Sequence, residues 1–260
     1  NIVQRKISIK LNYRGIGQSR IKLFDLENQC EFVPSLDNLS AGQSTLLGIF
    51  CTIIQYSDRT NLNKSIYLQD IEGIVISTRP DCLDEEVLNL LSEINENHFM
   101  WIELGLQTIH DKTLDNMNIG YHLINFHHAM AELSNRNIKA VVHLILGLPG
   151  ETEEDMFKSL HYVTNSGVFG IKIHLMNIVS SSPLYKEMPD YVSFGSLESY
   201  VDLVVRMIEE IPPNITIHRL TGDVPRNLLV SPEWSYKKRT ILNSINRELN
   251  NRDTYQGAKL

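Results

Sequence analysis

The chain has 260 residues, which is enough for one large domain or two small ones. Hydrophobic residues make up 42% and charged residues 21%, as in ordinary globular proteins with a core. The formal net charge of −7 argues against a general nucleic-acid-binding surface, which would be basic. No apolar run approaches the roughly 18 residues that a membrane span requires, so we expect a soluble protein with no membrane partner.

The three cysteines are Cys30, Cys51 and Cys82, too few and too scattered for a disulfide framework. We therefore expect a reducing compartment and a cytoplasmic location. Charge interrupts the apolar runs of the first ten residues, so we expect no signal peptide there.

Apolar runs alternate with helical patterns along the chain. Seven strands are predicted, several of them apolar nearly throughout, as in parallel strands covered on both faces: Lys6–Leu11, Leu46–Ile54, Ile71–Ser77, His98–Leu104, Ile138–Leu146, Phe169–Met176 and Ile215–Leu220. Five helices are predicted from apolar residues at helical spacing: Asp84–Glu96, Leu123–Asn137, Thr152–Gly167, Ser196–Ile211 and Ser235–Asn251. This alternation predicts an α/β fold, a partial (β/α)6-7 barrel with parallel strands and outer helices.

Residues 12–45 show no sustained period of either kind, so we predict an irregular segment there. We assign residues 1–211 to the barrel and residues 212–260 to a C-terminal extension packed on it. The basic stretch Tyr236–Thr240 (YKKRT) lies in this extension. We interpret it as the solvated face of a helix in preference to a nucleic-acid-binding patch.

Polar residues gather where the predicted strands end. The polar segments are Gln55–Thr60, Ser77–Asp81, Glu103–Thr108, His143–Glu151, His174–Asn177 and His218–Asp223. In β/α barrels the loops that follow the strands converge on one mouth. The sequence therefore predicts a polar site at this mouth.

Three of these polar residues lie inside apolar strands. The carboxylate of Glu103 is either half-exposed or paired, and if buried it requires a partner such as Arg79. His143 and His174 lie in strands of core type, where a hydrogen-bonded core histidine and a ligand to a bound group are both typical. Both interpretations of each histidine stay open.

The end of the seventh strand also has two interpretations. Asp223 closes the barrel through an ion pair with Arg219 or Arg226, or else His218 or Asp223 faces a substrate as a catalytic acid–base group. A tight Thr-Gly turn and a following proline should hold these polar side chains in place.

The polar motifs occur in an order that resembles one family. They are STRPDCL (77–83), WIELGLQTIHDKTLDNMN (101–118), HLILGLPGET (143–152), GIKIHLMNI (170–178) and HRLTGDVPRNLL (218–229). Together they resemble the radical S-adenosylmethionine (radical SAM) proteins, in particular bacterial Fe–S oxidoreductases related to the catalytic subunit of Elongator. The resemblance runs from about Gly73 to Gly257.

This resemblance implies a partial β/α barrel that holds S-adenosylmethionine against a 4Fe–4S cluster. An electron from the reduced cluster cleaves the sulfonium, and the resulting 5′-deoxyadenosyl radical abstracts hydrogen from a substrate. The resemblance therefore implies an enzyme of oxidoreductase type, with a reductant such as flavodoxin or ferredoxin and an unknown substrate.

The same matching implies which residues bind the cofactor. Ile145 packs on the adenine, and Gly147 lets the cofactor approach the backbone. The implied set is Gln55 and Tyr56 on the second predicted strand, Glu103, Gln107 and Thr108 on the fourth, His143, Ile145 and Gly147 on the fifth, and His174, Met176 and Asn177 on the sixth. Residues 174–177 (HLMN) offer backbone groups to the adenine edge.

The sequence departs from the family at the cluster motif. The family binds its cluster through C-x3-C-x2-C or a close variant, and no three cysteines here have that spacing, so we assign no metal ligand. The family's NRGH reads NIGY at Asn118–Tyr121, which lacks the arginine that can hold the cofactor carboxylate. Either the chain shown omits a cysteine loop, which the intact motifs favour, or the protein is a catalytically silent barrel that binds S-adenosylmethionine.

The substrate has a candidate class. The segment Ile211–Leu229 resembles the one that follows the barrel in Elongator-type proteins, which act on transfer RNA. RNA is therefore a candidate partner and RNA modification an alternative role, although the acidic net charge counts against it.

Overall fold

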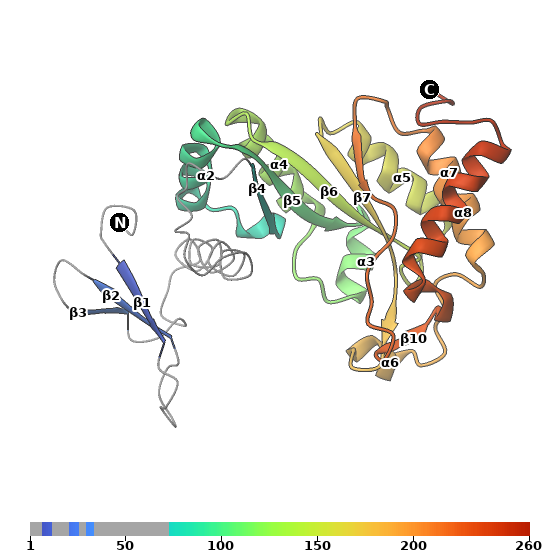
Figure 1. Cartoon of the computed structure of the whole chain (residues 1–260), viewed down its shortest axis with the longest axis horizontal. Coiled ribbons are helices and arrows are strands. Elements are labelled where there is room, and N and C mark those ends of the chain that lie inside the picture. The colour runs from blue at the N-terminus through green and yellow to red at the C-terminus, as the bar shows by residue number, and fades with distance from the viewer. Residues whose placement is uncertain (1–6, 12–20, 26–29, 34–72) are drawn as a thin grey trace, which may run out of the picture. The chain divides into compact units, whose positions relative to one another are not determined.

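The computed structural model describes residues 7–11, 21–25, 30–33 and 73–260 (Figure 1). The chain divides into two compact units, one of residues 1–72 with 84–96 and the other of residues 73–83 with 97–260. The predicted strand Leu46–Ile54 lies outside the described residues.

The first unit contains a three-stranded antiparallel sheet. Its strands are β1 (Ile7–Leu11), β2 (Ile21–Asp25) and β3 (Cys30–Val33), in the order β1-β2-β3. The segment predicted as the first parallel strand does form a strand, but its parallel pairing is wrong, because β1 runs antiparallel to β2. The irregular segment predicted for residues 12–45 is wrong where β2 and β3 form, since these strands are defined by backbone pairing with β1 and with each other and not by a local apolar pattern.

Helix α2 (Glu85–Asn97) lies almost wholly in the first unit and confirms the first predicted helix. The carboxylate of Asp84 accepts a hydrogen bond from the amide of Val87 at 2.9 Å, as an N-cap does. Two glutamates follow in the first turn, where the helix dipole favours negative charge.

The second unit is built on a five-stranded parallel sheet in the order β4-β5-β6-β7-β9 (Figure 1). The strands are β4 (Gly73–Thr78), β5 (Phe99–Gln107), β6 (Lys139–Leu146), β7 (Gly170–Leu175) and β9 (Thr216–Arg219). Each matches a predicted strand, and their parallel pairing confirms the α/β fold class.

One face of this sheet is apolar and buried. Its side chains include Ile74, Ile76, Met100, Ile102, Leu104, Val142, Leu144, Ile171 and Ile173. Helices α4 (Leu123–Asn135) and α5 (Glu153–Thr164) pack against β6. Buried and more exposed residues alternate along much of each strand, because successive side chains point to opposite faces of the sheet. The polar side chains therefore lie on the opposite face.

The turn between β6 and α5 ends in a capping box. The hydroxyl of Thr152 accepts a hydrogen bond from the amide of Asp155 at 3.2 Å, and the Asp155 carboxylate accepts one from the amide of Thr152 at 3.0 Å. This reciprocal pair fixes where α5 begins, and with it the path of the GLPGE segment that leaves the sheet.

Helices α7 (Leu197–Glu209) and α8 (Lys238–Asn251) lie side by side, in orange and red in Figure 1. The end of the chain returns to α7, where the amide of Gly257 donates to the carbonyl of Ile208 at 3.1 Å. The division at residues 211 and 212 stays a prediction; β9, which follows it, belongs to the same sheet as β4 to β7.

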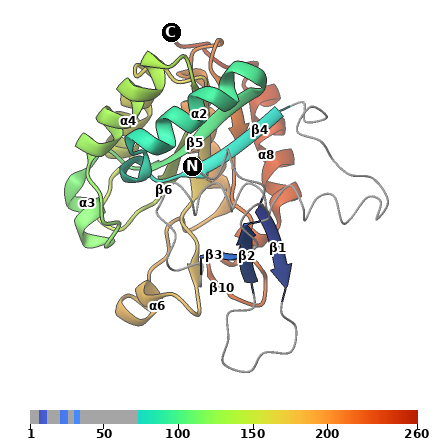
Figure 2. The ribbon, with the colours of Figure 1, turned by 90° about the vertical axis from the view of Figure 1, so that its left-hand side faces the viewer.

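Short elements complete the second unit. They are η4 (Pro80–Cys82), α3 (Asp111–Asn116), β8 (Ile178–Val179), α6 (Pro183–Glu187), β10 (Leu229–Ser231) and η5 (Glu233–Tyr236). Strands β8 and β10 pair antiparallel, and β10 and α6 lie at the same end in both views (Figures 1 and 2). No helix in the part of the chain that the structure describes is long and apolar enough to cross a membrane.

Candidate functional site

The strand register brings the polar side chains of four strands onto one face. Ser77 of β4 lies opposite Glu103 of β5, His143 of β6 lies opposite Lys172 of β7, and Ile145 lies opposite His174. Residues two apart on a strand share a face. The site therefore consists of side chains that come from segments far apart in the sequence.

Glu103 is the centre of this polar group. Its carboxylate, on a residue only 6% exposed, accepts hydrogen bonds from Ser77 at 2.8 Å and from the ammonium of Lys172. Burial acts to raise the pKa of Glu103, but Lys172 and Ser77 outweigh it and bring the pKa down to about 2. The predicted partner, Arg79, is wrong: its guanidinium pairs with Asp81 at 2.6 Å, because both follow β4.

His143 and His174 form a stacked pair beside Glu103. Their ring centroids lie 5.3 Å apart with planes tilted by 20°. Nε2 of His143 lies 3.3 Å from the Glu103 carboxylate without a well-aligned hydrogen bond, and Nε2 of His174 is buried with no partner among the described residues. Burial lowers the pKa of His143 despite the nearby carboxylate, and burial together with His143 lowers the pKa of His174 to about 4. Both rings are therefore neutral at pH 7.

The ring of His174 is expected to stay neutral until the pH falls to about 4, against an ordinary pKa of 6.5. Because its pKa is lower in the folded than in the unfolded chain, the protein should lose stability as the pH falls from 6.5 towards 4. The measurement is an NMR titration of the histidine Cε1 protons, with His174 assigned through its absence in His174→Gln. Titration near 6.5 would contradict the burial that lowers this pKa.

Gln107 ends β5 in a backbone conformation with φ of +70°, which few residues other than glycine adopt. A Cβ placed on Gly105 would lie 2.7 Å from Nε2 of the Gln107 side chain. The Gln107 side chain therefore turns back over β5. The hydroxyl of Tyr121 donates to the carbonyl of Gly105, and the Arg79 guanidinium lies 5.3 Å from the Tyr121 ring centroid. The NIGY segment is thereby joined to the ends of β4 and β5.

Thr108 does not lie with the polar group on the sheet face. It is 1% exposed, and its hydroxyl donates to the Glu151 carboxylate at 2.6 Å and lies 3.4 Å from the hydroxyl of Ser159. Burial raises the pKa of Glu151. The Thr108 side chain thus holds the GLPGE segment against the end of β5, and its predicted cofactor contact stays a prediction.

Gly147 has a φ of +75°, and side chains of this chain fill the space beside it. A Cβ there would lie 2.8 Å from both Ser193 and Phe194, and the hydroxyl of Tyr191 donates to the Gly147 carbonyl at 2.9 Å. Close packing of residues 191–194 therefore accounts for the glycine. Its predicted approach to a cofactor stays a prediction, as does that of Ile145, which is only partly buried on the sheet face.

The backbone of Met176 is already bonded within the chain. Its amide donates to the carbonyl of Leu146 at 2.9 Å, and its carbonyl accepts from the hydroxyl of Ser193 at 2.8 Å. The side chain of Asn177 accepts a hydrogen bond from Ser235 at 2.6 Å. The predicted adenine contacts of these two residues are untested, and the Met176 amide is occupied by the sheet.

His218 and Asp223 have different surroundings. The His218 ring lies 5.5 Å from that of Trp101 and 5.9 Å from that of Phe169. Asp223 is exposed and forms ion pairs with Arg219 at 3.4 Å and Lys238 at 2.8 Å. The ion pair with Arg219 is one of the two that the sequence allowed. The catalytic role of either residue stays a prediction.

Lys172 is one of two described site residues that the sequence analysis did not predict. A signal was present, because this lysine interrupts the apolar strand GIKIHL two residues before His174 and so shares its face. Trp101 was also missed; it lies two residues before Glu103 on β5, and its indole nitrogen is 3.5 Å from the Glu103 carboxylate.

The residues that the structure describes do not fit an iron–sulfur cluster. Among the described side chains, no group of three histidine, cysteine, aspartate or glutamate residues can hold a metal ion. Cys82 is exposed in η4, and the three cysteines of the sequence lack ligand spacing. Gln55 and Tyr56 lie outside the described residues.

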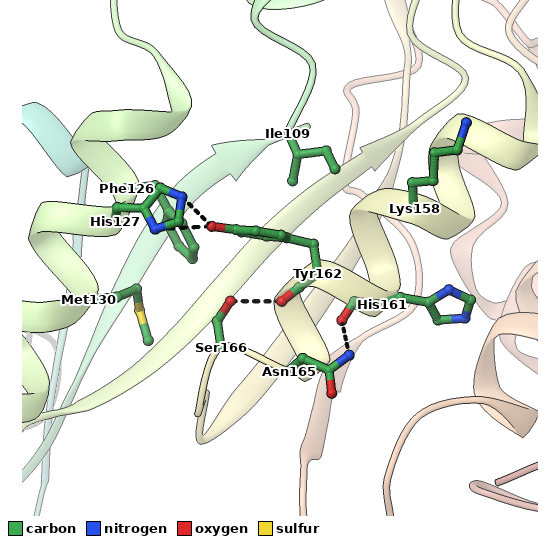
Figure 3. Close-up of a pocket in the computed structure, with 9 residues that line it drawn as sticks. All are labelled: Ile109, Phe126, His127, Met130, Lys158, His161, Tyr162, Asn165 and Ser166. Carbon is green, nitrogen blue, oxygen red and sulfur yellow. Dashed lines mark hydrogen bonds between the residues drawn. The ribbon is translucent and has the colours of Figure 1, made fainter.

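A groove of about 660 Å³ lies on the outer helices α4 and α5 (Figure 3). The hydroxyl of Tyr162 is hydrogen-bonded to the ring of His127, and Ser166 donates to the carbonyl of Tyr162. These bonds satisfy the hydroxyls of Tyr162 and Ser166 within the chain, and no residue of the polar sheet face lines the groove. The groove is therefore separate from the candidate site.

Comparison with known families identifies the class of protein. The model of the Radical SAM superfamily matches residues 52–163, and that of the Radical SAM C-terminal domain matches residues 168–251. The chain belongs to the radical SAM superfamily, as its motifs predicted.

Individual relatives agree with this assignment. The YtqA protein of Bacillus subtilis is 38% identical over 200 residues, which cover 76% of this chain and 62% of YtqA. Elongator complex protein 3 of Schizosaccharomyces pombe is 27% identical over 168 residues, 61% of this chain and 29% of that protein. This chain thus spans less than two thirds of the length of either relative.

A solved structure shows the same fold. Elp3 of the archaeon Methanocaldococcus infernus, with an N-terminal deletion, superposes with a TM-score of 0.68 at 16% identity, over 85% of this chain and 53% of that one. At this identity the likeness concerns the fold alone.

Proposed function

We propose that this chain is the barrel of a radical SAM enzyme and that its polar sheet face binds S-adenosylmethionine. The stacked pair of His143 and His174 carries the proposal, because both rings are neutral and only half-buried, and Nε2 of His174 is buried with no partner among the described residues. Buried polar atoms without partners are rare in folded proteins and suit a ligand with a hydrogen-bonding edge. When bound and reduced by one electron, S-adenosylmethionine supplies a 5′-deoxyadenosyl radical that abstracts hydrogen.

The residues present fit the nucleoside part of this cofactor. The two imidazoles suit the polar edge of adenine, and Ile145, opposite His174 in the sheet, suits its apolar face. Neutral imidazoles bind an uncharged base without having to lose a proton. Glu103 has both oxygens engaged by the chain, so we assign it a positioning role, in which it holds Lys172 and His143 in place.

The test is calorimetric titration of the full-length protein with S-adenosylmethionine and with S-adenosylhomocysteine. His174→Leu should weaken binding of both about tenfold through loss of one hydrogen bond. His161→Gln is the matched control, because this histidine lies on α5 and pairs with Glu210. Equal affinities of the wild-type protein and His174→Leu would remove the histidine pair from the proposed site.

The second candidate function is a catalytically silent barrel that binds S-adenosylmethionine. The cysteine spacing favours it, because Cys30, Cys51 and Cys82 cannot form the family's motif. The enzyme and the silent barrel are distinguished by measuring the intact mass and the iron content of the full-length protein. Binding of about four irons per chain after anaerobic reconstitution supports the enzyme, and cofactor binding without iron supports the silent barrel.

A further inference from the structure

A second cavity, of about 320 Å³, lies at the β9 edge of the sheet. It is lined by Ile217, His218, Arg219, Leu220, Thr221, Lys238 and Leu242. The guanidinium of Arg219 and the ammonium of Lys238 both contact the carboxylate of Asp223, at 3.4 Å and 2.8 Å. Two cations therefore share one carboxylate, and this group carries a net positive charge.

The amino end of α8 opens at the same cavity, through Lys238. Lys237, in the N-cap position, makes no side-chain capping hydrogen bond, and the first turn contains no acidic residue. The helix instead begins with Lys237, Lys238 and Arg239. Basic residues at this end oppose the helix dipole, and the first amides of a helix have no partner within it. Both features suit a bound anion.

Thr221 supplies an independent sign of a ligand. It lines the cavity and is 1% exposed, yet its hydroxyl has no hydrogen-bond partner among the described residues. His218 also lines the cavity, but its Nε2 lies against β7, where a Cβ on Gly170 would be 2.6 Å from it. An unsatisfied buried donor is costly in a folded protein, so a ligand that accepts from it is favoured.

The cavity borders the candidate site. A Cβ placed on Gly222 would lie 3.7 Å from Nδ1 of His174 and 3.5 Å from the side chain of Asn177. Ser235, three residues before α8, donates to Asn177. The turn after β9 and the start of α8 therefore stand next to the carboxyl end of β7, where the histidine pair lies.

We propose that Arg219, Lys238, Thr221 and the first amides of α8 bind a phosphate group. A phosphate oxygen takes the place of the exposed Asp223 carboxylate between the two cations, and another accepts from the Thr221 hydroxyl. The position beside His174 makes this phosphate part of the substrate. That last statement rests on the proposed function, whereas phosphate binding itself does not.

The experiment measures binding of inorganic phosphate to the full-length protein by calorimetry at low ionic strength. Arg219→Gln and Lys238→Gln should each weaken binding about tenfold, because each removes a charged hydrogen bond. Arg247→Gln, with the same change of charge further along α8, should alter it by less than about twofold. Asp223→Asn should tighten binding, since it removes the competing carboxylate; a misfolded variant cannot produce that gain.

The source of the phosphate is tested with adenosine 5′-monophosphate and a short oligoribonucleotide at two salt concentrations. Tighter binding of the oligoribonucleotide with a steeper salt dependence supports the site and assigns it to RNA. Equal binding of both supports the site and assigns it to a small phosphate ester. Absence of phosphate binding, or binding that Arg219→Gln and Lys238→Gln leave unchanged, overturns the proposal even if S-adenosylmethionine binds at the histidine pair.

Discussion

Replacement of Lys172 by methionine is expected to lower the free energy of unfolding by about 3–5 kcal/mol, because it leaves the Glu103 carboxylate buried without its cation. The two side chains are 15% and 8% exposed, so water can replace little of the lost interaction. Ser77 remains, but one hydroxyl does not neutralise a charge. Urea denaturation at pH 7 measures the loss.

The pH dependence of this loss gives a second readout. The pKa of Glu103 is about 2, below its ordinary value of 4.5, so its stabilisation is present above pH 4.5 and is lost as the pH falls towards 2. In Lys172→Met the carboxyl takes up a proton at higher pH, which removes the buried charge. The difference between the two proteins should therefore shrink as the solution is acidified.

The matched control is Lys158→Met on α5. Its ammonium lies 2.8 Å from the Glu154 carboxylate, but both side chains are largely exposed, and ion pairs in water contribute little. This change should cost much less than Lys172→Met. Equal losses in the two variants, or a Lys172→Met loss that does not depend on pH, would show that Glu103 does not need its cation.

Gly147→Ala is expected to cost about 2–4 kcal/mol in the protein without any cofactor. The backbone at Gly147 has a φ of +75°, a conformation that is unfavourable for residues with a Cβ. The added carbon would also lie 2.8 Å from Ser193 and Phe194. Thermal or urea unfolding measures the loss. The effect comes from packing within the chain, so it should appear whether or not S-adenosylmethionine is present.

Gly150→Ala separates the cost of a positive φ from the cost of the close contacts with Ser193 and Phe194. Gly150 has a similar φ of +87°, but no atom lies within 4 Å of the position that its Cβ would take. In Gly150→Ala the free energy of unfolding should fall only by the cost of placing a residue with a Cβ at positive φ, about 1–2 kcal/mol. If Gly147→Ala lost no more than Gly150→Ala, residues 191–194 would not pack against Gly147, and the cofactor would remain the reason for the glycine.

The sequence predicted the elements of the second unit closely. The strands β4, β5, β6, β7 and β9 and the helices α4, α5, α7 and α8 all lie where periodicity placed them. These patterns are local, since alternation along a strand and three- to four-residue spacing on a helix depend only on neighbours in the chain. The ordered motifs likewise identified the superfamily, because they are read along the chain and need no contacts between strands.

The sequence also located part of the polar group, since Glu103, His143 and His174 stand out in apolar strands. It could not assign their partners. Arg79 was the nearest cation in the neighbouring strand end, yet Lys172, 69 residues from Glu103, is the one that reaches the carboxylate. That choice depends on the register across three strands, which no local pattern encodes.

Contacts between distant segments decided the rest. The antiparallel pairing of β1 comes from β2, a strand that the apolar pattern did not predict. Gly147 is shaped by residues 191–194, and Asp223 is shared between Arg219 on β9 and Lys238 on α8. The sequence by itself therefore determined the main elements of the second unit and the superfamily, and it allowed the Asp223–Arg219 pair. The tertiary structure decided which of the possible charge partners meet, because ion pairs form between side chains that folding brings within about 4 Å.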